Sequence, residues 1–75
     1  MGEIRTKISL FISNREEAYV EMNSEDRYVV MPLEISENSL RCNILRVFTL
    51  GGSAKNNAVL DINNIKYFGR KKSLG

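Results

Sequence analysis

The sequence lacks several residue types on which small proteins often depend. It has one cysteine, Cys42, so an intrachain disulfide is excluded, and no histidine, so a zinc site would rest on one thiolate and carboxylates. Its 75 residues allow one small hydrophobic core, and chains of this size often gain stability from disulfides, metals or association. We therefore expect no metal and no cofactor, and stabilisation by a partner or by self-association.

Long apolar runs are also missing. No stretch approaches the roughly 18 apolar residues of a membrane span. The first 15 residues alternate polar and apolar side chains and include Glu3, unlike a cleavable signal. A lone cysteine is typical of a reducing compartment. These features predict a cytoplasmic protein without membrane contact.

The absence of histidine also argues against catalysis. General acid–base chemistry near neutral pH would need a strongly perturbed carboxylate or lysine. The acidic pairs at residues 16–17 and 25–26 lie in polar segments and are interpreted as solvated charge. Cys42 alternates with Leu40 and Ile44 on an apolar face, which predicts a buried core thiol rather than a nucleophile. We predict no enzyme and no catalytic residue.

Charge is distributed unevenly along the chain. Residues 1–37 hold 4 basic and 8 acidic residues, a net charge of −4, whereas residues 38–75 hold 7 basic and 1 acidic, a net charge of +6. The whole chain carries only +2. This asymmetry suggests a dipolar surface whose basic part comes from the second half of the chain.

Short segments of period two, separated by polar turns, predict a chain built of β-strands. Two interpretations fit residues 14–22, which alternate as a strand but also match a capping box that could begin a short helix. Turns are expected at residues 23–26, 36–39 and 63–64, and a flexible hairpin loop at 50–57. The predicted strands are residues 8–13, 18–22, 28–35, 40–49, 58–62 and 65–68.

Two strands show irregularities. In residues 28–35, alternation places Val29, Met31, Leu33 and Ile35 on one face, and Pro32 on the other predicts an edge strand or a bulge. In residues 40–49 the rhythm breaks at residues 44–45. A one-residue bulge there would return Val47 and Thr49 to the buried face and leave Arg46 and Phe48 outside.

This pattern predicts a mainly β fold. Five or six short antiparallel strands in so short a chain favour a strongly bent sheet that closes into a small barrel of the SH3-like or Sm-like kind, with room for one short helix. Closure also hides sheet edges. We expect one domain over residues 1–68 and a mobile basic tail over residues 69–75.

Two segments carry a resemblance to a known family. Residues 29–35, VVMPLEI, and residues 59–65, VLDINNI, resemble the "v-x-P-l" and closing strands of a WYL domain, and the similarity covers residues 17–68. That family is an Sm-like or SH3-like barrel found in bacterial regulators and defence proteins. Its Trp-Tyr-Leu signature would fall near residues 41–44, which contain no aromatic residue. The resemblance implies the barrel fold.

Several features could bind a ligand. The Gly51-Gly52-Ser53 loop with Lys55 could hold a phosphate through backbone amides, but it lacks P-loop spacing and is interpreted as a hairpin turn. The basic residues 70–72 fit either a solubilising tail or phosphate contacts. Of the neighbours Tyr67 and Phe68, we expect one to pack in the core.

The leading hypothesis is a non-enzymatic binding module that contacts nucleic acid. A cation and an exposed aromatic side by side on a strand, as predicted for Arg46 and Phe48, suit stacking on an unpaired base next to a phosphate. The predicted nucleic-acid-binding residues are Arg41, Arg46, Phe48, Lys55, Lys66, Arg70, Lys71 and Lys72.

A rival hypothesis fits the same residues. Arginine and aromatic residues also dominate protein-binding hot spots, so the chain could be a small interaction or inhibitor domain of phage or mobile-element origin. In that case the acidic residues Glu16, Glu17, Glu21, Glu25 and Asp26 could matter as much as the basic ones. A third alternative is a homo-oligomer, in which the partner is a second copy.

Overall fold

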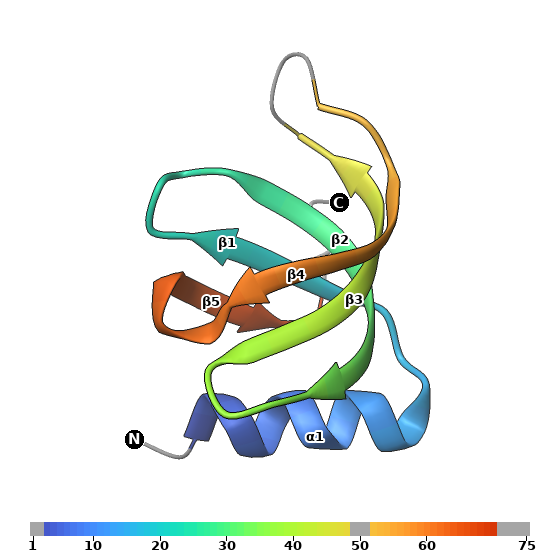
Figure 1. Cartoon of the computed structure of the whole chain (residues 1–75), viewed down its shortest axis with the longest axis vertical. Helices are drawn as coiled ribbons and strands as arrows, with labels where there is room; N and C mark the ends of the chain where they lie inside the picture. Colours follow the sequence, from blue (N-terminus) through green and yellow to red (C-terminus); the bar gives the residue numbers. More distant parts are fainter. Residues whose placement is uncertain (1–2, 49–51, 71–75) are drawn as a thin grey trace.

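The computed structural model describes residues 3–48 and 52–70, and it confirms a mainly β chain. It also contains one helix, at Glu3–Asn14 rather than within the segment 14–22 where the sequence allowed one. All strand pairs are antiparallel, in the order β4-β3-β2-β1-β5, so β4 and β5 form the two edges of one sheet. The helix lies beneath the sheet in Figure 1. The elements are α1 (Glu3–Asn14), β1 (Ala18–Met22), β2 (Arg27–Ile35), β3 (Ser39–Val47), β4 (Lys55–Asp61), the 3-10 turn η1 (Ile62–Asn64) and β5 (Ile65–Gly69).

The sheet is strongly curled, as two backbone hydrogen bonds of η1 show. The Ile62 amide donates to the Asn38 carbonyl in the β2–β3 turn at 2.8 Å, and the Asn23 amide in the β1–β2 turn donates to the Asn64 carbonyl at 2.7 Å. These turns flank opposite ends of β2, whose nine residues would span roughly 30 Å if straight. A three-residue turn can join them only because β2 bends back on itself, and all three connections lie on one side of Figure 1.

Bulges account for the bend of β2. Its register with β3 shifts between Val29 and Val30 and again between Pro32 and Glu34, and bulges bend a strand and increase its twist. The sequence prediction was right about a bulge at Pro32, but β2 is an internal strand and not an edge. The predicted shared face was not continuous: Ile35 packs against the inner core cluster, whereas Val29 is buried outside it. Val30 and Pro32, predicted on the opposite face, are buried as well.

Residues 8–13, predicted as a strand, belong instead to helix α1. Ile4, Ile8, Phe11 and Ile12 recur at helical spacing and contact the core, whereas Leu10 is 57% exposed. The alternation of apolar residues at positions 8, 10 and 12 misled the prediction, because positions 8 and 12 also lie one helical turn apart. No helix in the described ranges is long and apolar enough to cross a membrane.

The helix ends in a Schellman motif. The Glu16 amide donates to the Phe11 carbonyl at 2.9 Å and the Arg15 amide to the Ile12 carbonyl at 3.1 Å. Arg15 occupies the left-handed position with φ of 52°, where glycine is usually found. At the other end, the Arg5 guanidinium donates to the Glu37 carbonyl and so ties the helix to the β2–β3 turn.

One apolar cluster fills the inside of the curled sheet. The helix and all five strands contribute to it, and its fully buried members include Ile8, Val20, Val30 and Leu40. Phe68 from β5 meets Phe11 from the helix in an edge-to-face contact with ring centroids 5.2 Å apart. This contact confirms that one residue of the Tyr67 and Phe68 pair packs in the core.

Other strand predictions are confirmed. Residues 18–22 form β1 and not a helix, with Ala18, Val20 and Met22 buried. In β3, pairing passes from Ile44 opposite Val30 to Arg46 opposite Val29, so Leu45 is the extra residue of a bulge. Val47 packs against the core as expected, and Thr49 lies outside the described residues.

Candidate functional site

Three aromatic rings lie side by side on the outer face of the sheet. Tyr19 in β1 alternates with buried neighbours and therefore points away from the core. Tyr67 in β5 is half-buried next to the buried Phe68, and Phe48 follows β3 and is 43% exposed. The centroid of Tyr19 lies 6.2 Å from that of Phe48 and 6.0 Å from that of Tyr67. We call Phe48, Tyr19 and Tyr67 the aromatic strip; it crosses from the end of β3 to edge strand β5.

Backbone and side-chain packing hold the strip in place. Val29 pairs with Tyr19 in β1 and Arg46 in β3, and it is 8% exposed although it is not part of the inner core cluster. It therefore forms a small apolar floor on the outer face. The Tyr67 ring lies across Gly69, where a Cβ atom would stand 2.6 Å from the Tyr67 hydroxyl oxygen. A larger residue at position 69 would therefore displace the Tyr67 ring from this position.

Positive charges border the strip. The Lys7 ammonium, from the helix, lies 5.8 Å from the centre of the Tyr67 ring, a cation–π distance. Arg46 stands in the same cross-strand row as Val29 and Tyr19, and the carbonyl of Arg27 accepts the Phe48 amide at 3.0 Å. Within residues 3–48 and 52–70, none of these three cationic side chains enters an ion pair.

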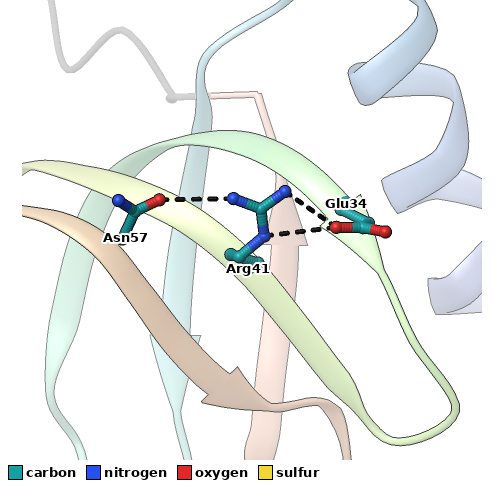
Figure 2. A network of polar contacts seen from close by, with 3 residues as sticks. All are labelled: Glu34, Arg41 and Asn57. Carbon is teal, nitrogen blue, oxygen red and sulfur yellow. Dashed lines mark hydrogen bonds and ion pairs between the residues drawn. The ribbon is translucent and has the colours of Figure 1, made fainter.

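Arg41, predicted as a phosphate contact, already forms an ion pair and hydrogen bonds within the protein. Its guanidinium lies between two acceptors on neighbouring strands (Figure 2). Its Nη2 atom donates to Glu34 Oε1 at 2.7 Å and its Nε atom to the same oxygen at 3.2 Å, while Nη1 donates to Asn57 Oδ1 at 3.3 Å. The backbone amide of Asn57 in turn donates to Asn43 Oδ1 at 3.0 Å. This network joins β2, β3 and β4, so Arg41 has a clear structural role.

The other predicted cations do not gather at the strip. Arg70 pairs with Glu16 at 2.8 Å, next to the end of the helix. Lys55 begins β4 and lines a groove, and Lys66 is exposed on β5 at a register shift. Gly69, assigned to the tail by the sequence, is buried in β5. Lys71 and Lys72 lie outside the described residues.

A groove of about 460 Å³ opens onto the interior of the curled sheet. Tyr28, Ile44, Val47 and Leu60 line it, with Lys55 beside them. Burial raises the pKa of the Tyr28 hydroxyl, and the negative charge of Asp26 adds to this effect. Asp26 and Ser53 also line the groove, so its walls are of mixed polar and apolar character.

Cys42 is completely buried, as the alternation with Leu40 and Ile44 predicted. Burial raises the pKa of its thiol to about 11, which keeps the sulfur protonated and unreactive at neutral pH. In the part of the chain that the structure describes, no three carboxylate or thiol groups are placed to share a metal ion.

The sequence hypothesis included Phe48 and Arg46 but missed Tyr19, Tyr67 and Lys7. The outward position of Tyr19 follows from alternation in β1, but its contact with Phe48 depends on the order of strands in the sheet. Lys7 lies in helix α1, where the sequence predicted a strand over residues 8–13 and no helix, so its position above Tyr67 had no signal in the sequence.

Comparisons with known proteins identified no relative of this chain. No family model matches the chain, and searches of curated proteins and of solved structures found no match.

Proposed function

We propose that this chain is a non-enzymatic module that binds nucleic acid through the outer face of its sheet. The observation that carries the proposal is the aromatic strip, in which the Tyr19 ring lies 6.2 Å from Phe48 and 6.0 Å from Tyr67 at a solvent-facing surface. Base–aromatic stacking contributes about 1–3 kcal/mol per base, so three rings offer substantial affinity from a small area.

Phosphate contacts would come from the cations around the strip. Lys7, Arg27 and Arg46 carry no carboxylate partner among the described residues, so their charges are available to a ligand. Arg41 and Arg70 are each neutralised by a glutamate. The proposed basic surface is therefore smaller than the one predicted from the sequence, and it includes Lys7 of the helix. Glu21, paired in register with Arg27 and Tyr67, reduces its net charge further.

The proposal includes closure of the curled sheet into a small barrel of the SH3-like or Sm-like kind. Support comes from η1, which joins edge strand β4 directly to edge strand β5 in three residues. Such a barrel would hold the outer face rigid, which favours preorganised rings. The buried, unpaired Cys42 thiol fits a reducing compartment such as the cytoplasm. The WYL resemblance stays a prediction.

A protein-binding function is the second candidate. The specific observation in its favour is the pairing of Arg41 and Arg70 with glutamates, which leaves a face of mixed charge rather than a continuous basic surface. Exposed apolar side chains at Leu45 and Val59, 43% and 63% exposed, add to the area that a protein partner could cover.

The experiment is a measurement of oligonucleotide affinity against salt concentration. For single strands, each phosphate that a cationic side chain neutralises contributes about 0.7 to the slope of log K against log[salt]. Arg46→Gln should therefore flatten the slope by about that amount. Lys55→Gln, which removes the same charge from edge strand β4 instead of β3, is the matched control and should leave the slope nearly unchanged. Equal effects of the two substitutions would contradict the proposed surface.

A further inference from the structure

The spacing and inclination of the rings restrict what can stack on them. Neighbouring ring centroids are 6.0 and 6.2 Å apart, and the planes are inclined by 51° and 59°. In a duplex, successive bases on one strand stand about 3.4 Å apart and parallel. Bases resting on two neighbouring rings of the strip therefore cannot also stack on each other.

We infer that the ligand of this face is a single strand of nucleic acid with its bases unstacked, an inference that rests on the proposed function. Three consecutive nucleotides would place their bases on Phe48, Tyr19 and Tyr67. Each base is then held by a ring in place of its neighbour, and every base has a π-face, so the site tolerates any sequence. A duplex offers no free base faces along its length and binds this surface only through phosphates.

Lys7 and Gly69 fit this role at the Tyr67 end of the strip. The Lys7 ammonium lies over the ring at 5.8 Å, so a base that stacks there displaces it. Because lysine carries its charge on a flexible stem, the ammonium can move to the phosphate of the same nucleotide. Gly69 leaves open the space beneath Tyr67, since a Cβ atom there would stand 3.0 Å from the ring carbon Cζ.

The first experiment compares a mixed-sequence DNA 12-mer with the same 12-mer annealed to its complement, at equal salt. We expect the single strand to bind at least about tenfold more tightly, since two or three stacked bases add affinity that the duplex lacks. Equal affinity for the two forms would refute the inference and leave the proposed function standing. If neither form binds at low salt, the proposed function fails as well.

The second experiment removes rings and keeps the fold. Tyr19→Leu keeps Val29 covered by an apolar side chain, and it should weaken single-strand binding about 5- to 150-fold with an unchanged salt slope. Val59→Ala, an exposed apolar residue on β4, is the matched control and should have no effect. Gly69→Ala should shift the Tyr67 ring without deleting it and should also weaken binding. Unchanged affinity in both Tyr19→Leu and Gly69→Ala would overturn the inference.

Discussion

Alkaline pH should destabilise the protein through Cys42. The folded thiol has a pKa of about 11, against 9.0 for the free group. Between these values the unfolded chain loses the thiol proton while the folded chain keeps it, so the free energy of unfolding falls as pH rises. The thiol's stabilising contribution is intact below pH 9 and is lost progressively up to pH 11. The loss is about 1.4 kcal/mol at pH 10 and about 3 kcal/mol once both states are ionised.

The assay is urea unfolding followed by circular dichroism at pH 7, 8, 9 and 10. Cys42→Ala is the control, because it removes the thiol and leaves every other titratable side chain of the sequence in place. The wild type should lose about 1.4 kcal/mol more than the variant between pH 7 and 10. Equal losses would refute the assignment. Rapid labelling of the native thiol at pH 7 would refute it too, since the side chain has no exposed surface.

Three further predictions concern stability. Arg15→Gly should stabilise the protein by about 0.5–1 kcal/mol in urea unfolding because Arg15 has a φ of 52°, whereas Ser13→Gly within the same helix should destabilise it by about 0.5 kcal/mol. Asp61→Ala should cost about 0.5–2 kcal/mol in the same assay, because the Asp61 side chain accepts from the Asn63 amide at 2.9 Å and caps η1; no loss would show that the cap is dispensable. Ile8→Ala should lower the free energy of unfolding by about 2–5 kcal/mol, and Leu10→Ala by much less, because Ile8 is fully buried and Leu10 is 57% exposed; equal losses would contradict the packing of α1.

The strands were predictable where one face is buried and the other is exposed to solvent. Val20 in β1 and Cys42 in β3 alternate with polar or exposed neighbours, so local pattern alone identified their inner faces. In the first segment, Ile8 and Ile12 satisfy a period of two and a period of 3.6 together. The exposure of Leu10 and the burial of Phe11 separate the two periods, and both follow from tertiary packing.

Strand β2 was harder to predict because its buried face changes along its length. Bulges next to Val29 and after Pro32 shift the alternation, so a single period fitted to residues 28–35 put residues from both sides of the sheet on one face. The proline signalled one irregularity. The extent of the bend had no local signal, because the hydrogen bonds that reveal it join η1 to turns far away in the sequence.

The candidate site was predictable only in part. Arg46 and Phe48 followed from a break in alternation within one strand, which is local information. The contact between Tyr19 and Phe48 joins residues 29 positions apart and requires the strand order. Likewise, composition could show that Arg41 is basic but not that Glu34 and Asn57 already occupy its guanidinium.

The place of β5 beside β1 has a consequence for synthesis of the chain. Edge strand β5 completes the pairing of β1, and Phe11 in the helix packs against Phe68. While residues 65–69 are still inside the ribosome, β1 has an unpaired outer edge and the helix lacks its contact with Phe68. A fold that depends on contacts between the two ends of a chain has a high contact order and forms slowly. Native packing of the first elements therefore waits until the last strand has emerged.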